Sequence, residues 1–303
     1  MVVIVKQVSG LGNQLFQYAA GRYFARMFSA DLRIITAHPK HALSHGTFAR
    51  PLLLPRFTIK APISEMTGLD KLLLSRRRPG HILSALITLL TRTHIAHEAF
   101  AKRYRFLPEL LLPSGTSTLY LDGYWQACAY ADAVAEDLRQ EFRLQEAPTG
   151  HNLEMQNRIA SASTPVSLHM RRGDYALAAE GNIALPLGYY ARAISLMRQN
   201  LHHPIFFVFS DDLDFAKQNL PEDVERVFVE GNDDFSSHED LRLMFECHHH
   251  IIANSSFSWW GAWLNSRPEK TVIAPRHWHL TPDSYYPDLL PSSWLLLDSL
   301  RNG

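Results

Sequence analysis

The stretch that most restricts the fold runs from residue 165 to 274, where apolar segments of two kinds alternate. Short runs rich in β-branched and aromatic residues are each followed by a longer segment whose apolar residues recur at helical spacing. Repeated alternation of this kind predicts an α/β fold, a parallel sheet with helices on both faces. We expect strands at 165–169, 204–209, 224–229, 249–253 and 271–274, and helices at 187–200, 213–219, 238–246 and 257–265.

The amino-terminal half begins in a similar way. Residues 2–5 are a β-branched run that ends at a Ser-Gly pair, and residues 13–27 have helical spacing, which predicts a strand, a glycine turn and a helix. A further helix is expected at 130–142. The proline-rich, basic region 37–115 gives little regular signal apart from a helix candidate at 84–90.

The length of the chain, 303 residues, exceeds the size at which one hydrophobic core usually stops growing. Turn residues at 147–150 suggest a boundary there. We therefore expect two domains, 1–150 and 151–303, with the last ~20 residues packing back on the first domain. A single large domain is the alternative.

Composition excludes several classes of protein. Lysine plus arginine number 30, as do aspartate plus glutamate, so the chain has no net field to attract nucleic acid. Its two cysteines, Cys128 and Cys247, cannot form a disulfide framework and fit a reducing compartment. The apolar start is too short for a signal sequence, and no later apolar run reaches the ~20 residues of a membrane span. We expect a cytoplasmic protein, soluble or at most peripheral to a membrane.

Four polar motifs fall at the ends of predicted strands, which is where parallel sheets bind ligands. Together they predict a site along one sheet edge or lining one interdomain cleft. They are Gly10-Leu11-Gly12-Asn13-Gln14, His169-Met170-Arg171-Arg172-Gly173-Asp174-Tyr175, Ser210-Asp211-Asp212 and Asn254-Ser255-Ser256-Phe257-Ser258-Trp259-Trp260-Gly261.

The second motif suits an anionic ligand. Arg171 and Arg172 offer permanent positive charge and paired donors, as a diphosphate requires. Because neighbouring residues leave a strand on opposite sides, only one needs to face the ligand, and the other is expected to pair with a carboxylate such as Asp174. His169 can share a face with Arg171 and bond a nucleobase or ribose, or it can be a structural histidine.

The other motifs leave alternatives open. The Gly10-Leu11-Gly12 turn fits phosphate binding or an ordinary tight turn, and it lacks the third glycine of a dinucleotide-binding motif. Asp212-Leu213-Asp214 matches the Asp-x-Asp pattern of a metal–nucleotide site, but aspartate there also caps helices or accepts from guanine. The Asn254-Ser255-Ser256 turn can hold a phosphate at a helix start.

Two clusters have structural interpretations that we favour. His248, His249 and His250 suggest zinc, but consecutive strand residues point to opposite faces, so no metal is expected there. The tryptophans at 259, 260 and 263 fit core packing better than a sugar platform.

The four motifs, in order along both halves, resemble those of glycosyltransferase family 11, the α-1,2-fucosyltransferases. The resemblance includes the extensions Leu15-Phe16-Gln17-Tyr18-Ala19 and Ala262-Trp263-Leu264. It implies a GT-B-like fold, two Rossmann-type domains facing a central cleft, with the acceptor on the side of the first and GDP-β-L-fucose bound by the second. It also implies transfer of L-fucose to the 2-OH of a terminal galactose, with inversion at the anomeric carbon and without a metal or other cofactor.

The resemblance implies roles for nine residues. Arg171 is expected to be catalytic, neutralising the departing diphosphate. The implied donor-binding residues are His169 and Asp211 at the guanosine, Ser255, Ser256 and Phe257 at the phosphates, and Asn13, Gly12 and Arg172.

The general base that inversion requires is not identified, although Asp31, His38, His41 and Glu98 are available in the first domain. The expected acceptor is a galactose-terminated oligosaccharide or a lipid-linked glycan, of the kind found in O-antigen or capsule. The basic region 71–105 either docks on an anionic membrane or is a solvated face. The competing functions are a fucosyltransferase of another linkage, a non-catalytic GDP- or glycan-binding protein, and a zinc hydrolase.

Overall fold

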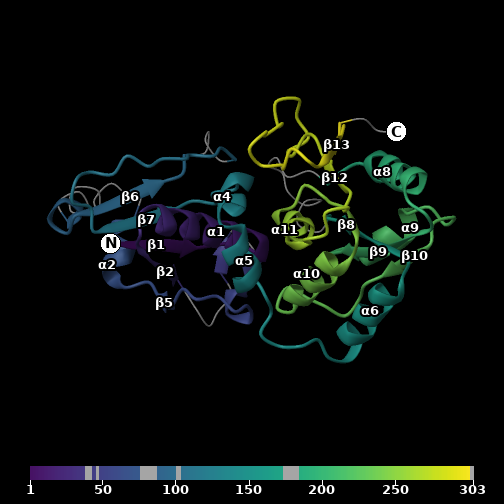
Figure 1. The fold of residues 1–303 in the computed structure, drawn as a ribbon, viewed down its shortest axis with the longest axis horizontal. Coiled ribbons are helices and arrows are strands. Elements are labelled where there is room, and N and C mark those ends of the chain that lie inside the picture. Colours follow the sequence, from purple (N-terminus) through teal and green to yellow (C-terminus); the bar gives the residue numbers. More distant parts are fainter. Residues whose placement is uncertain (38–42, 46–47, 76–86, 100–103, 173–183, 301–303) are drawn as a thin grey trace. The chain divides into compact units, whose positions relative to one another are not determined.

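The computed structural model divides the chain into two compact units, Met1–Gln145 and Glu146–Gly303 (Figure 1). The structure describes residues 1–37, 43–45, 48–75, 87–99, 104–172 and 184–300. The division lies just before the turn residues 147–150. Each unit contains one main parallel sheet, which confirms the predicted α/β class.

The first unit is built around a five-stranded sheet in the order β5-β2-β1-β7-β6, all of whose pairings are parallel. A two-stranded antiparallel ribbon, β3-β4, lies apart from it. Its elements are β1 (Val2–Gln7), α1 (Leu11–Met27), β2 (Asp31–Thr36), β3 (Leu43–His45), β4 (Phe48–Arg50), the 3₁₀ helix η1 (Leu54–Arg56), β5 (Ile63–Glu65), α2 (Gly68–Leu73), β6 (Thr93–His97), β7 (Thr118–Asp122), α4 (Cys128–Ala133) and α5 (Ala135–Glu141).

Alternate residues of a strand point to opposite faces of the sheet, and in this first sheet both sets include buried apolar residues. On β1, Val5 faces the helix α1, where Gly21 lets the helix approach closely. Ile4 faces the other way, into a cluster that includes Tyr120 of β7 and Leu73 of α2. The unit therefore has the Rossmann-type arrangement expected from the strand, turn and helix at its start.

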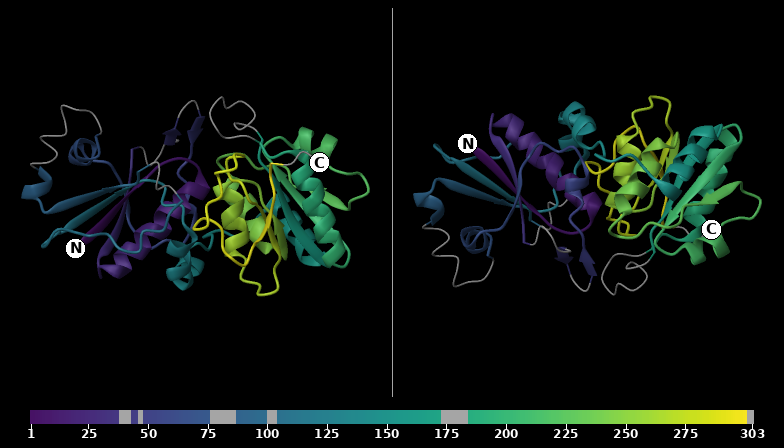
Figure 2. Two further views of the ribbon diagram at one scale, coloured as in Figure 1. Left: turned by 90° about the horizontal axis from the view of Figure 1, so that it is seen from above. Right: turned by 90° about the horizontal axis from the view of Figure 1, so that it is seen from below.

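The second unit is built around a six-stranded parallel sheet in the order β10-β9-β8-β11-β12-β13. Figure 2 shows helices on both of its faces. Its elements are α6 (Gly150–Ser161), β8 (Thr164–Met170), α8 (Leu187–Asn200), β9 (Pro204–Ser210), α9 (Leu213–Asn219), β10 (Arg226–Phe228), α10 (Ser237–Glu246), β11 (His249–Ile251), α11 (Ser256–Leu264), β12 (Val272–Pro275) and β13 (Leu295–Leu297).

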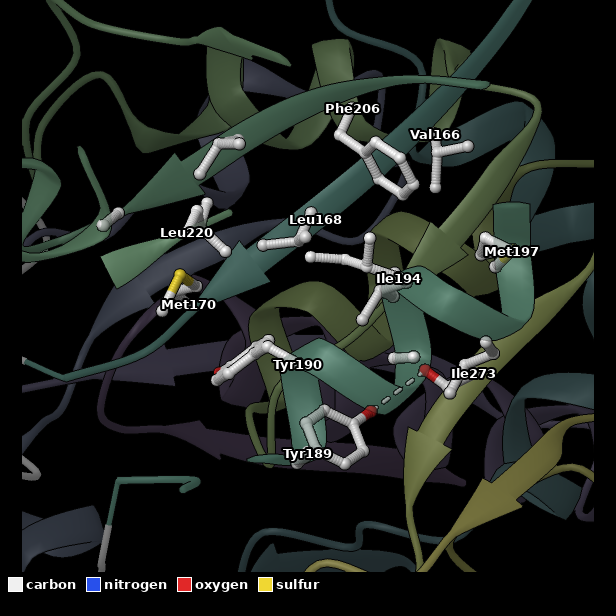
Figure 3. Close-up of a cluster of buried hydrophobic side chains, with 14 of the residues drawn as sticks. Val166, Leu168, Met170, Tyr189, Tyr190, Ile194, Met197, Phe206, Leu220 and Ile273 are labelled. Atoms are coloured by element: carbon white, nitrogen blue, oxygen red, sulfur yellow. Dashed lines mark hydrogen bonds between the residues drawn. The ribbon is translucent and has the colours of Figure 1, made fainter. Parts of the chain in front are cut away.

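Two cores cover this second sheet. Figure 3 shows the one on the α8 face, where Leu168 of β8 and Phe206 of β9 pack with Ile194. On the opposite face Phe207 of β9 packs with residues of α6 and α10, among them Leu243. This two-sided burial explains why the strands of this unit are almost continuously apolar.

Every strand and helix predicted between 165 and 274 is present, with ends that shift by a few residues. The predicted helix 130–142 is instead two short helices, α4 and α5, because the backbone leaves the helical conformation at Val134. The helix candidate at 84–90 lies partly outside the described residues, of which 87–90 are helical.

Near the end of the chain, β13 pairs with β12 and extends the second sheet. The expectation that the last residues pack on the first domain stays a prediction. Ser299 then bonds to the backbone of His277 in the same unit. The described helices include none that is both long and apolar enough to cross a bilayer.

Candidate active site

The candidate site lies where the parallel strands of the second sheet end. The loops after β8, β9 and β11 leave the same edge, because all three strands run in one direction and are neighbours in the sheet. Three of the four sequence motifs occupy these loops. Parallel packing thus brings together residues that are far apart in the chain.

Arg171 is held by an aspartate from the neighbouring strand. The pairing of Met170 with Ser210 at the ends of β8 and β9 places the next residues, Arg171 and Asp211, side by side. Nη1 of Arg171 lies 3.0 Å from Oδ2 of Asp211, and both side chains are only partly exposed. The other carboxylate oxygen accepts a 2.8 Å hydrogen bond from the backbone N–H of Arg172. Asp211 therefore fixes both the guanidinium group of Arg171 and the backbone at Arg172.

Arg172 turns to a different partner. Its Nε lies 3.2 Å from Oδ2 of Asp212, and its guanidinium stacks on the Phe215 ring at 3.6 Å from the centroid. The two arginines therefore diverge, as the strand geometry predicts. The carboxylate found beside Arg172 is Asp212, whereas Asp174, the candidate partner named from the sequence, lies outside the described residues.

The Asp-x-Asp pattern has a structural explanation at its first position. Oδ1 of Asp212 accepts the backbone N–H of Phe215 at 3.1 Å and so caps α9. Since its second oxygen pairs with Arg172, both oxygens of this carboxylate are engaged. The capping alternative therefore accounts for Asp212.

His169 is buried at the end of β8 with an exposed fraction of 5%. Burial lowers the pKa of its imidazole to about 3; Asp211 opposes this shift and Arg171 adds to it, so the ring is neutral at physiological pH. Its Nδ1 is buried and bonds to none of the described residues, and its ring lies 5.9 Å from that of Phe257. A neutral ring nitrogen next to Arg171 is suited to a hydrogen bond with a nucleoside.

The third loop begins α11. The Ser255 hydroxyl accepts the backbone N–H of Phe257 at 3.3 Å, which caps the helix, and Ser256 is the first helical residue. Trp259 and Trp260 follow with no exposed surface, and Nε1 of Trp259 donates to the carbonyl of Leu289. The tryptophans are core residues, which confirms the structural interpretation of this cluster.

The three consecutive histidines do not converge. His250 is fully buried, with Nε2 2.8 Å from the Asn265 amide nitrogen and Nδ1 2.7 Å from the Ser167 hydroxyl. Because the amide nitrogen can only donate, Nε2 must accept and Nδ1 must carry the proton. His249 accepts the backbone N–H of Thr271 instead. Within the described ranges, no three histidine, cysteine or acidic side chains are grouped so as to hold a metal ion.

The glycine turn of the first unit is held by side-chain hydrogen bonds. Ser9 has a positive φ of 70°, and α1 starts directly after Gly10. Gly12 is buried in the first turn of the helix, and the Asn13 side chain donates to Ser9 and accepts from Gln126. The proposed contacts of Gly12 and Asn13 with the donor stay predictions.

The glutamines after this turn were not singled out in the sequence, yet they hold the loops of the first unit. Gln14 bonds to the backbone of Ser9, Pro51 and Leu53, and Gln17 bonds to that of Val8 and Gly123. The available signal was that Gln14 ends the Gly-Leu-Gly-Asn-Gln motif and that Gln17 lies in its extension.

Of the four candidates for a general base, the structure describes Asp31 and Glu98. Asp31 begins β2 and is exposed at the amino end of the sheet, opposite to the edge where ligands bind, so it does not fit the role. The Glu98 carboxylate accepts the backbone N–H groups of Tyr124 and Trp125 at 2.7 and 2.9 Å, which gives it a structural task. His38 and His41 lie outside the described residues.

Comparison with known sequences identifies the family. The profile of glycosyl transferase family 11 matches residues 88–285, more than half of the chain. The chain belongs to this family. It is therefore a glycosyltransferase, and the resemblance seen in the motifs is confirmed. The two Rossmann-type units give it the GT-B-like fold class.

Relatives of this family 11 chain span most of its length. An alpha-1,2-colitosyltransferase of Escherichia coli is 29% identical over 309 residues, covering 98% of this chain and 99% of the relative. The O-antigen biosynthesis glycosyltransferase WbnK of Escherichia coli is 29% identical and covers 89% and 92%. The galactoside 2-alpha-L-fucosyltransferase Sec1 of Mus musculus is 24% identical and covers 84% and 62%.

A solved structure with a similar fold is a glycosyl transferase of family 9 from Veillonella parvula. It is 12% identical, with a TM-score of 0.50 over 99% of this chain and 86% of its own. At this identity the likeness concerns the fold alone.

Proposed function

We propose that this family 11 enzyme transfers L-fucose from GDP-β-L-fucose to the 2-OH of a terminal galactose, with inversion at the anomeric carbon. The acceptor is a galactose-terminated oligosaccharide or a lipid-linked glycan. The observation that carries the proposal is the guanidinium of Arg171, fixed by Asp211 at the carboxyl end of β8. The names of the colitosyl- and fucosyltransferase relatives support the α-1,2 linkage.

The chemistry of the transfer explains the need for such a group. As the sugar bond breaks, negative charge develops on the β-phosphate of the leaving GDP. A guanidinium keeps its charge at any physiological pH and donates two parallel hydrogen bonds. Arg171 would stabilise this charge in the transition state, while the N–H groups at the start of α11, behind Ser255, would hold the phosphates.

We also propose that no metal ion takes part. The guanidinium of Arg171 would offset the diphosphate charge in place of a metal, and Asp212 is already engaged as a helix cap and ion-pair partner. Activity in EDTA should therefore equal activity in added magnesium. A strict magnesium requirement would contradict this part of the proposal.

The decisive test is Arg171→Ala, assayed for fucose transfer to a galactoside with analysis of the linkage formed. The loss of one transition-state contact should lower kcat by about 10²- to 10³-fold. The matched control is Arg198→Ala, which removes an arginine paired with Asp223 on the same unit but at the far end of α8. Equal activity of both variants would refute the role of Arg171. Binding of GDP without turnover would favour a binding protein.

A second candidate donor is a nucleotide-activated colitose, which the colitosyltransferase relative favours. Competition between the two activated sugars in one assay distinguishes the candidates, because the preferred donor has the higher kcat/KM. A product with another linkage would leave the donor assignment intact and correct only the acceptor hydroxyl.

Membrane contact through region 71–105 stays a prediction. Within its described part, Leu89 and Leu90 have exposed fractions of 78% and 81%, and Lys71, Arg92 and Arg105 are exposed. Exposed leucines beside basic residues suit an anionic bilayer that carries a lipid-linked acceptor.

A further inference from the structure

The carboxyl edge of the first sheet contains a buried aspartate that holds a lysine and a histidine together. Asp122 is the last residue of β7 and has an exposed fraction of 6%. Its Oδ1 accepts from Nζ of Lys6 at 3.0 Å, and its Oδ2 lies 2.9 Å from Nδ1 of His97. Neither Lys6 nor His97 was a candidate from the sequence.

The strand register explains this grouping. His97 is paired directly with Asp122, and Lys6 follows Val5, whose partner is Leu121. The three residues thus form one row across β1, β7 and β6. Two positions earlier on each strand, Ile4, Tyr120 and Ile95 form an apolar row on the same face. The polar row is the continuation of the core at the edge where the strands end.

The row orients the imidazole of His97. The carboxylate of Asp122 lies between the ammonium of Lys6 and Nδ1 of His97 and holds both. Donation from Nδ1–H to Asp122 leaves the lone pair on Nε2. The His97 side chain has an exposed fraction of 43%, and no described residue bonds to Nε2. A carboxylate behind a half-exposed imidazole is the arrangement of a general base.

The position in the sheet also suits a ligand. From β1 the chain passes through α1 to β2 on one side, while β7 and β6 lie on the other side of β1. The crevice beyond such a switch point, at the carboxyl ends of the strands, is where open α/β sheets bind ligands. Lys6 and Asp122 stand on the two strands that flank it.

We propose that His97 is the general base of the transfer reaction, with Asp122 and Lys6 as positioning residues. This inference rests on the proposed function. Nε2 of His97 takes the proton of the acceptor hydroxyl while that oxygen bonds to the anomeric carbon of the donor sugar. The bond between that carbon and the β-phosphate oxygen breaks, its electron pair leaves with GDP, and the imidazolium then releases its proton to water.

The test compares His97→Ala with His94→Ala, a control on the same strand whose side chain points to the opposite face. Removal of a general base should lower kcat by about 10²- to 10⁴-fold in His97→Ala, with the KM for GDP-fucose nearly unchanged. The acidic limb of kcat/KM, at which the imidazole gains its proton, should disappear. Free imidazole should restore part of the rate. Asp122→Asn should lower kcat while preserving the shape of the site.

The outcomes separate the two hypotheses. If the wild-type enzyme transfers fucose and His97→Ala retains its kcat, the inference is wrong and the proposed function stands. Loss of activity without a change in the pH profile and without imidazole rescue assigns His97 a structural role, which also overturns the inference. If His97→Ala does not fold, His97→Gln and the pH profile of Asp122→Asn give the same readouts. A wild-type enzyme inactive on GDP-fucose defeats the proposed function and the inference together.

Discussion

At the scale of single residues, the surroundings decide what a histidine does. His250 is closed in by Ser167 and Asn265, and burial holds its pKa well below the usual value, with the nearby Lys270 adding to the shift. His169 is buried but keeps an unbonded Nδ1 next to Arg171. His97 is half exposed and oriented by a carboxylate. The same side chain is therefore a structural link at His250, a proposed contact to the donor nucleotide at His169 and the proposed base at His97.

Replacement of His250 by alanine should destabilise the protein without touching the site. The change removes a buried ring and leaves Ser167 and Asn265 with lost hydrogen bonds, which together cost about 2 to 4 kcal/mol of the free energy of unfolding. Urea denaturation measures this. His248→Ala, at a partly exposed neighbour, should cost less than about 1 kcal/mol. Equal effects would mean that the buried ring has no special part in stability.

At the scale of elements, close packing positions the helix that carries the glycine turn. A Cβ on Gly21 of α1 would lie 2.5 Å from Cγ2 of Val5 and 2.8 Å from Cδ1 of Leu32. The absence of a side chain therefore lets α1 rest directly on β1 and β2. This contact fixes where the first turn of the helix, with Gly12 and Asn13, meets the end of β1.

Gly21→Ala should consequently destabilise the first unit. In an open helix this change gains up to about 1 kcal/mol, but overpacking here costs about 1 to 3 kcal/mol, so we expect a net loss in thermal or urea unfolding. The double variant with Val5→Ala should recover part of the loss, because it removes the atom nearest to the clash. Gly68→Ala at the start of α2 is the control, since no atom lies within 4 Å of its Cβ position. A stabilised Gly21→Ala would contradict the packing argument.

At the scale of the whole molecule, each unit has its own sheet and its own buried polar groups. The family match begins at residue 88 and ends at 285, so it spans parts of both units.

In the second unit, Asp240 of α10 accepts from Asn232, whose side chain also bonds to Asn152 of α6. Burial raises the pKa of Asp240 to about 6, helped by Glu239 and opposed by the Asn232 hydrogen bond.

This raised pKa gives the stability a pH dependence of known sign. An unfolded aspartate has a pKa near 3.9, so between about pH 4 and 6 the folded state binds the proton more tightly, and its stability falls as pH rises. Asp240→Asn removes this loss. The variant should exceed the wild type by about 1 to 2 kcal/mol in free energy of unfolding at pH 8 and by less at pH 5. An offset equal at both pH values would show that the carboxyl does not titrate in this range.

The α/β class, the elements from 165 to 274 and the family could be predicted from the sequence, because each depends on local periodicity or on short motifs that need no knowledge of the tertiary contacts. The sequence also indicated that Arg171 and Arg172 diverge, since that follows from strand geometry alone.

The partners across strands depend on the three-dimensional fold. Asp211 meets Arg171, and Asp122 meets both Lys6 and His97, because sheet order and register join residues separated by up to 116 positions. The β13 pairing was likewise invisible, since three residues carry no period. Proximity in the sequence suggested Asp174 as a partner for an arginine, but Arg172 pairs with Asp212, because a pairing across a parallel sheet depends on how all the strands are ordered.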